Sequence, residues 1–274
     1  MIIYIGTNNV CLYNCIYNYY VSHMITYFKA ELIQDPIILS QKKNNKIIFT
    51  QTIPDFFNKI HSSNKLYLLN TEQLTIALNG SFQIDLNKEF KKAINNNITI
   101  IDYSPVNSYL FQKLLNYKVP YVLEPFYPNI AIPHKTIEIS ALLNTRYRKR
   151  FAKKFIKYPI NNLNNKWGKK RLNIKLQSKI LINIHADNNY KVAELMRLYE
   201  AVACRCIVIS QMGIEDKLNT LYPYIIFTDK NNINMKVKDV LENYPVYYDM
   251  IYGTKTNKEI FAPISEKYLN FIKS

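Results

Sequence analysis

The chain has 274 residues, of which 48% are hydrophobic, and a formal net charge of +16 at pH 7. The hydrophobic content excludes an intrinsically disordered protein, and the length allows one large domain or two of ordinary size. The positive charge favours partners that carry phosphate, such as nucleotides, nucleic acid or an anionic membrane. Solvated surface lysines would give the same charge without any such partner.

The cysteines and the N-terminal sequence indicate the cellular compartment in which we expect the protein. The 4 cysteines have no Cys or His partners at the spacing of a structural zinc site, which predicts reduced thiols in a reducing compartment. Polar residues interrupt the apolar N-terminal stretch, so we expect neither a signal peptide nor a membrane helix. We therefore expect a soluble, cytoplasmic protein, whose charge also allows peripheral membrane contact.

Short apolar runs alternate with helical patterns along the first half of the chain. The predicted strands are Met1–Gly6, residues 36–39, Lys46–Thr50, Lys65–Leu69, Ile98–Ile101 and Val119–Leu123. Helices are predicted after Asn8, over Pro54–Ile60, after Thr71, up to Asn95 and from Ser104 to about Tyr117. Glu72 and Asp102 each follow a predicted strand, where a catalytic carboxylate could face a ligand. Glu72 could equally be a first-turn carboxylate that favours the helix dipole.

A proline-rich segment separates two halves of similar length. Pro125, Pro128 and Pro133 make regular structure improbable over residues 124–136, so we predict domains of residues 1–133 and 134–274. Each half alternates strands with helices, which indicates a parallel sheet covered on both faces. The predicted fold class is therefore α/β, with two Rossmann-like domains that face a cleft.

The second half centres on a β–turn–α–β unit at Lys179–Ser210. Its predicted strands are Lys179–His185 and Cys206–Ser210, joined by a helix from Tyr190 to Arg205. Further strands are predicted at Ile137–Leu142 and Tyr224–Thr228, and helices at Gly213–Leu221, Val237–Tyr244, Pro245–Tyr252 and Pro263–Ile272. Ligands of such units bind at the carboxyl ends of the strands, against the helix N-terminus. His185 lies at such an end.

A dense basic stretch, Arg146–Lys154, follows the first strand of this half. Arginine can hold a diphosphate with a bidentate fork, and the anion would otherwise need a metal ion. The chain contains no Asp-x-Asp pair of the kind that usually holds that metal. The same stretch could instead be the solvated face of a basic amphipathic helix.

Several phrases resemble the GT-B nucleotide-sugar glycosyltransferases. Glu200-Ala-Val-Ala-Cys-Arg-Cys-Ile-Val-Ile-Ser is similar to their E-A-small-A-x-G-x-P-V-V-x-S segment, although Arg205 and Ile207 replace the usual Gly and Pro. Residues 179–185 with Glu194 and Arg197 resemble the K-I-L-x-N-x-H … E-x-x-R block of a small GT-B-like subgroup from bacteria and large DNA viruses. The Leu-Asn-Thr-Glu-Gln-Leu phrase at residues 69–74 and the Trp-Gly-x-x-Arg phrase that begins at Trp167 are similar to further phrases of that subgroup.

The resemblance implies roles for particular residues. Glu200 would take the ribose hydroxyls, and Trp167 would stack on the base or simply pack beneath its loop. Asn144, Arg146 and Arg150 match a donor-binding phrase approximately. The residues implied to bind the donor are thus Asn144, Arg146, Arg150, Trp167, His185, Glu194, Arg197 and Glu200. Arg197 could instead merely pair with Glu194, one helical turn away.

These observations lead to a functional hypothesis with two alternatives. The hypothesis is a metal-independent glycosyltransferase that moves a sugar from a UDP- or GDP-sugar to a hydroxyl of a glycan or glycoconjugate, with no other cofactor and in the host cytoplasm if the protein is viral. Its catalytic candidates are Glu72, Asp102 and His185. The alternatives are a basic nucleic-acid-binding protein and a GT-B-like binding subunit without catalysis. Dispersed tyrosines and the lack of a nucleic-acid motif disfavour the first alternative.

Overall fold

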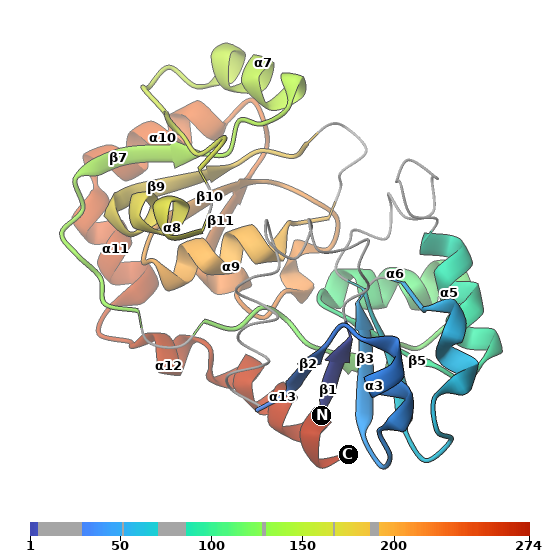
Figure 1. Ribbon diagram of the computed structural model, residues 1–274. Coiled ribbons are helices and arrows are strands. Elements are labelled where there is room, and N and C mark those ends of the chain that lie inside the picture. The colour runs from blue at the N-terminus through green and yellow to red at the C-terminus, as the bar shows by residue number, and fades with distance from the viewer. Residues whose placement is uncertain (5–28, 51, 71–85, 128–129, 167, 187–191) are drawn as a thin grey trace. The chain divides into compact units, whose positions relative to one another are not determined.

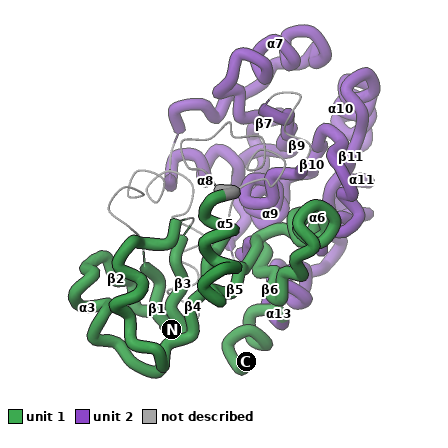
Figure 2. Tube along the Cα trace, turned by 90° about the vertical axis from the view of Figure 1, so that its right-hand side faces the viewer, with its two compact units in different colours: residues 1–124, 267–274 green, residues 125–266 purple. Residues whose placement is uncertain are grey.

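The computed structural model describes residues 1–274 except 5–28, 51, 71–85, 128–129, 167 and 187–191. The chain divides into two compact units, residues 1–124 with 267–274 and residues 125–266 (Figure 2). Each unit is built on one sheet, and every strand pair described in either sheet is parallel (Figure 1). The predicted α/β class with two Rossmann-like units is therefore confirmed.

The sheet of the first unit is built from short, largely buried strands. These are β1 (Ile2–Tyr4), β2 (Glu31–Ile33), β3 (Lys46–Thr50), β4 (Lys65–Asn70), β5 (Thr99–Asp102) and β6 (Tyr121–Val122). They lie in the order β2-β1-β3-β4-β5-β6. The helices α3 (Pro36–Gln41), α5 (Leu86–Asn95) and α6 (Pro105–Leu115) connect them. Isoleucine, leucine and phenylalanine fill the strands because helices cover both faces of such a sheet.

Residues 36–39 form the start of helix α3, and the prediction of a strand there is wrong. Asp35 caps the helix by accepting a hydrogen bond from the Ile37 N–H at 2.8 Å, and Pro36 occupies the first turn. A capping Asp followed by Pro is a helix-start signal that outweighs a run of only four apolar residues. Leu39 is buried, whereas Ile37 and Ile38 are exposed, as expected of one helical turn at a surface.

The last helix, α13 (Ala262–Lys273), links the second unit to the first. Residues 267–274 belong to the first unit, and the units divide again between Glu124 and Pro125. The Lys267 ammonium lies 2.6 Å from the buried Glu124 carboxylate, and the Tyr268 hydroxyl donates to the Glu124 carbonyl at 2.8 Å. The sequence analysis, by contrast, places one boundary after residue 133 and assigns the C-terminus to the second domain.

The second unit repeats the same plan. Its strands are β7 (Ile137–Ala141), β8 (Asn161–Asn162), β9 (Ser178–Asn183), β10 (Ile207–Gln211) and β11 (Ile225–Thr228), in the order β11-β10-β9-β7-β8. Its helices are α7 (Arg146–Phe155), α8 (Gly168–Gln177), α9 (Leu195–Ala203), α10 (Ile233–Glu242), α11 (Tyr244–Tyr252) and α12 (Asn257–Ile260). In Figure 1, α8 and α9 lie against one face of the sheet, and α10 and α11 lie against the other.

Both sheets follow the doubly wound order in which the first strand lies between the second and the third. The direction of winding therefore reverses between β1 and β3 in the first unit, and between β7 and β9 in the second. At such a reversal the connecting loops leave toward opposite faces and open a crevice at the carboxyl ends of the two strands, where ligands of this fold class bind. The topology thus indicates that the loops after β7 and β9 are where a ligand site of the second unit would lie.

Helix α9 begins at Leu195, and the prediction of a helix from Tyr190 is wrong. Glu194 occupies the N-cap, while Val192 and Ala193 lie before the helix and are fully buried. The apolar periodicity that predicts an earlier start reports burial, and a buried loop residue satisfies it as well as a helical one. The short helix predicted over Gly213–Leu221 is likewise reduced to a 3-10 turn at Asp216–Leu218.

Candidate functional site

The loops that follow β7 and β9 are tied together at the carboxyl edge of the second sheet. Thr145 caps helix α7 by accepting a hydrogen bond from the Arg148 N–H at 3.1 Å. The same hydroxyl donates to the Ala186 carbonyl at 3.0 Å, in the loop after β9. One side chain therefore fixes both the start of the helix and the neighbouring loop.

Arg148 is buried in this edge and braces the loop after β9. Its Nε donates to the Ile184 carbonyl at 2.8 Å, and its Nη1 donates to the Asn144 side-chain oxygen. The sequence favours Arg146 over Arg148 as a donor contact, since Arg148 stands in a run of cations. Its burial follows from helical spacing, because Arg148 lies three and four residues before the buried Phe151 and Ala152 and therefore on the inner face of the helix.

His185 lies between these elements and is 8% exposed. Its N–H donates to the side-chain oxygen of Gln211 at 3.2 Å, and its ring Nε2 has no hydrogen-bond partner among the described residues. Burial, together with the nearby guanidinium groups of Arg148 and Arg197, lowers the pKa of His185 to about 4. The imidazole is therefore neutral at pH 7, and it lies beside two fixed positive charges.

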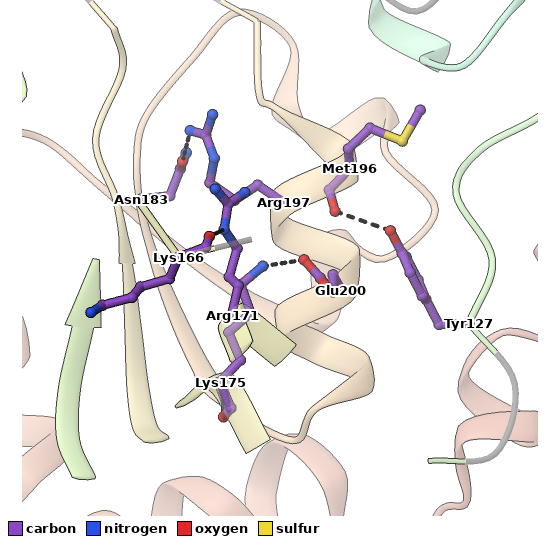
Figure 3. Close-up of polar contacts among 9 residues, drawn as sticks. Tyr127, Lys166, Arg171, Lys175, Asn183, Met196, Arg197 and Glu200 are labelled. Carbon is purple, nitrogen blue, oxygen red and sulfur yellow. Dashed lines mark hydrogen bonds and ion pairs between the residues drawn. The ribbon is translucent and has the colours of Figure 1, made fainter. Parts of the chain in front are cut away.

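Arg197 projects from the first turn of α9 toward the end of β9 (Figure 3). Its Nη1 donates to the Asn183 side-chain oxygen at 3.0 Å, and the Asn183 amide donates to the Ser210 hydroxyl at 3.0 Å. Its Nη2 lies 3.9 Å from the Glu194 carboxylate, so the predicted Glu194–Arg197 ion pair is present but long. Asn183 matches the Asn of the K-I-L-x-N-x-H phrase, but the sequence alone assigns it no role.

Glu200 forms a buried ion pair with Lys175 of helix α8, as Figure 3 shows. Lys175 is 1% exposed and Glu200 is 9% exposed. The bond is made by one carboxylate oxygen, Oε2, whereas Oε1 makes no hydrogen bond in the part of the chain that the structure describes. One carboxylate oxygen therefore remains available as an acceptor, and the contact of Glu200 with ribose hydroxyls stays a prediction.

The remaining donor-binding candidates lie on or just before helix α7. Asn144, Arg146 and Arg150 are all exposed. Neither Arg146 nor Arg150 forms an ion pair with any of the described residues. Arg146 is the first residue of the helix, so it lies at the carboxyl edge of the sheet together with Arg148 and His185. Trp167 lies outside the described residues.

The catalytic candidates of the first unit are placed differently. Asp102 is fully buried at the end of β5, where it accepts hydrogen bonds from the Asn70 amide at 2.6 Å, the Ser104 N–H at 2.8 Å and the Asn107 amide at 3.1 Å. Burial raises the pKa of Asp102 more than these hydrogen bonds lower it, and the resulting pKa is about 7. The geometry shows Asp102 joining β4, β5 and the start of α6. Glu72 lies outside the described residues.

No cluster of three or more His, Cys, Asp or Glu side chains that could hold a metal ion occurs among the residues that the structure describes. None of the helices within those ranges has the length and apolar character that crossing a bilayer requires.

The fold defines the class of protein. The carboxyl edge of the second sheet also brings together a neutral histidine and the three arginines Arg146, Arg148 and Arg197, and guanidinium groups can neutralise an anion such as phosphate. Two doubly wound parallel sheets in one chain are the GT-B architecture. The chain has the GT-B fold, and the resemblance found in its sequence is confirmed at that level.

The comparisons with known proteins agree with this class. No family model matches the chain. One uncharacterized protein of Acanthamoeba polyphaga mimivirus is 28% identical over 227 residues, which is 77% of this chain and 76% of that protein. Another from the same virus is 28% identical over 211 residues, which is 68% of this chain and 64% of that protein.

Among solved structures, S. aureus TarM in complex with fondaparinux, alpha-GlcNAc-glycerol and UDP superimposes with a TM-score of 0.54 at 14% identity. The alignment covers 83% of this chain but only 55% of the TarM chain. TarM is a GT-B glycosyltransferase, and a likeness at this identity establishes the shared fold.

Proposed function

We propose that the protein is a glycosyltransferase that binds a nucleotide-diphosphate sugar at the carboxyl edge of its second sheet and transfers the sugar to a hydroxyl of a carbohydrate acceptor. The observation that carries the proposal is the convergence of Arg148, Arg197 and the neutral His185, whose Nε2 has no partner among the described residues, at the winding reversal between β7 and β9. TarM, which has the same fold, was crystallised with UDP.

Each group has a defined task in this proposal. Transfer breaks the bond between the sugar and the diphosphate and forms a bond from the sugar to the acceptor oxygen, whose proton is released. Negative charge collects on the departing phosphate oxygen. Arg146 and Arg197 neutralise that charge, and His185 donates or accepts one hydrogen bond without adding charge of its own. Because cationic side chains supply the neutralisation, the proposal requires no divalent ion. The free Oε1 of Glu200 accepts from a ribose hydroxyl while Lys175 holds the other oxygen in place.

The test is calorimetric titration with UDP- and GDP-sugars. We expect measurable binding of at least one donor and a loss of roughly tenfold to a hundredfold for Arg146→Ala, the range for a hydrogen bond to a charged group. The matched control is Lys230→Ala, which removes an exposed cation just after the edge strand β11, which β10 and β9 separate from β7. Absence of heat with every donor, or equal losses in both variants, would contradict the proposal.

The role of Glu200 in donor binding is tested with a double variant, because a single substitution of Glu200 would also change the stability of the protein. Removing one partner of a buried ion pair leaves the other charge unpaired, which costs about 3–5 kcal/mol. The double variant Lys175→Met with Glu200→Leu removes both charges, and it should fold and lose donor binding. If it binds the donor as tightly as the natural protein does, Glu200 has no role in recognition.

A GT-B-like binding subunit without turnover is the second candidate. The pairing of Glu200 with Lys175 favours it, because a carboxylate that is already neutralised holds a hydroxyl more weakly than a free one does. Detection of a released nucleoside diphosphate in the presence of acceptor glycans would exclude this candidate. Donor binding without such release would favour it.

A further inference from the structure

Helix α7 presents a continuous cationic face to solvent. Arg146, Lys149, Arg150 and Lys153 recur at helical spacing, Lys154 lies beside them, and all five are exposed. The opposite face, with Arg148, Phe151 and Ala152, is buried. The helix therefore separates an inner face that packs against the sheet edge from an outer face that carries only positive charge.

Nothing in the surrounding sequence balances this charge. Residues 139–186 contain thirteen Lys and Arg residues and no Asp or Glu. None of the five exposed cations forms an ion pair with a described residue. The end of the helix is joined to α10 by a hydrogen bond from the Lys157 N–H to the Asn234 side chain at 2.9 Å, but the acidic residues of α10, Asp239 and Glu242, already pair with its own lysines.

This arrangement is unfavourable for an isolated helix. Like charges four residues apart repel, as in the pairs Arg146–Arg150 and Lys149–Lys153, and cations in the first turn oppose the helix dipole. An anionic partner reverses both effects. The helix has 10 residues and is roughly 15 Å long at 1.5 Å per residue, so its charges extend well beyond a single diphosphate.

We propose that this face of α7 binds an anionic glycan, a polysaccharide that carries phosphate, sulfate or carboxylate groups along its length. Ammonium and guanidinium groups are the only exposed polar chemistry that the helix offers, and regularly spaced anions on a flexible chain match a row of such groups. The choice of a glycan over other polyanions rests on the proposed glycosyltransferase function, in which the surface would hold an extended acceptor.

The aromatic and apolar residues of the helix argue against two other polyanions. Base stacking by single-stranded nucleic acid needs exposed rings, whereas Phe151 is buried and the half-buried rings of Tyr147 and Phe155 pack against it at centroid distances of 6.1 and 4.8 Å. Membrane association through an amphipathic helix needs an exposed apolar face. The large exposed apolar residues of the described chain lie on other elements.

The test measures binding of a fluorescein-labelled heparin octasaccharide by anisotropy at physiological salt. The variant carries Lys149→Gln, Lys153→Gln and Lys154→Gln, which keep good helix propensity and leave the proposed donor site intact. The matched control carries Lys217→Gln, Lys230→Gln and Lys258→Gln, three exposed lysines of the same unit. We expect at least a tenfold loss of heparin affinity for the α7 variant and less than a twofold loss for the control.

Three results would overturn the proposal: equal losses in both variants, tighter binding of a duplex DNA of equal charge, or tighter binding to phosphatidylserine vesicles. Acetylation of the natural protein with and without heparin gives a second measurement that needs no variant. Protection of Lys149, Lys153 and Lys154, but not of the three control lysines, is the expected pattern. UDP-sugar calorimetry on the same variants should be unchanged, so failure of this surface is distinguishable from failure of the donor site.

Discussion

His185 shows how a side chain acquires a role from its surroundings. A histidine at a strand end is ordinary, but here the ring is buried between two arginines and retains an unpartnered nitrogen. Because its pKa is about 4, the ring stays neutral in the folded protein down to that pH, whereas in the unfolded chain it takes up a proton near pH 6.5. A bound anion would offset the two guanidinium charges and raise the pKa.

We predict that the contribution of His185 to stability is complete above about pH 6.5 and is lost as the pH falls toward 4. The unfolded state binds the extra proton over this interval, so the free energy of unfolding falls by about 3 kcal/mol. The raised pKa of Asp102 has the opposite effect, because it makes the free energy of unfolding rise as the pH falls from about 7 to 4. The effect of His185 is therefore isolated by comparing the free energies of unfolding of the natural protein and His185→Gln, measured with urea at several pH values.

His61→Gln is the control for this titration, because His61 is exposed in the first unit. If the free energy of unfolding depends on pH in the same way for the natural protein and His185→Gln, the ring titrates as it does in water and the prediction is wrong. A proton-NMR titration of the natural protein supplies the direct check, with the His185 pKa rising when a nucleoside diphosphate is added.

At the scale of secondary-structure elements, the junction between α9 and β10 has an arginine in a backbone conformation that favours glycine, and the arginine side chain makes a tertiary contact. Arg205 ends α9 with a φ of 56°, a left-handed conformation that glycine adopts more easily, and related GT-B sequences usually have Gly there. Its guanidinium lies 4.9 Å from the centre of the Tyr252 ring and donates to the Lys255 carbonyl. The side chain thus joins this junction to the end of α11.

Arg205→Gly should destabilise the protein by about 1–3 kcal/mol. Glycine relieves roughly 1 kcal/mol of left-handed strain, but the variant loses a cation–π contact of about 1 kcal/mol and a charged hydrogen bond of about 1.5–3 kcal/mol. Guanidinium chloride unfolding gives the difference. Glu215→Gly is the matched control, since Glu215 has a φ of 47° and an exposed side chain, and it should be neutral or slightly stabilising. A more stable Arg205→Gly would mean that strain outweighs the contacts.

On the scale of the whole molecule, the two units are connected twice, because the chain returns to the first unit at its C-terminus. Phe271 is 1% exposed, and its ring packs edge-on against Tyr67 and Tyr121 at centroid distances of 5.2 and 4.9 Å. The Lys46 ammonium lies 4.9 Å from the same ring. Tyr268 and Phe271 of the C-terminal segment are therefore part of the first unit's core.

Phe271→Ala should destabilise the first unit by about 3–5 kcal/mol, the usual cost of removing a buried aromatic ring. Amide hydrogen exchange should become faster in β4 and β6 and stay unchanged in β9 and β10, which belong to the other unit. Leu269→Ala serves as the control on the same helix, because Leu269 is 42% exposed. Equal acceleration of exchange in both units would show that they unfold together.

The sequence by itself indicated most of the strands, the parallel sheets and the edge at which the proposed site lies, although β2 and β8 have no counterpart among the predicted strands. Buried strands have a short apolar run as their local signature, and parallel sheets place all their carboxyl ends on one edge, so His185, Arg146 and Arg197 could be assigned to that edge before any fold was known. These features depend on residues close together in the chain.

Only the tertiary structure decided which groups meet. Lys175 neutralises Glu200 across α8 and α9, Arg148 turns inward while its neighbours turn outward, and residues 267–274 join the first unit. Each depends on partners far apart in sequence, whose mutual burial strengthens an electrostatic or apolar contact that no local pattern encodes. The start of α9 belongs here too, because apolar spacing reports burial and only packing distinguishes a buried loop from a helix.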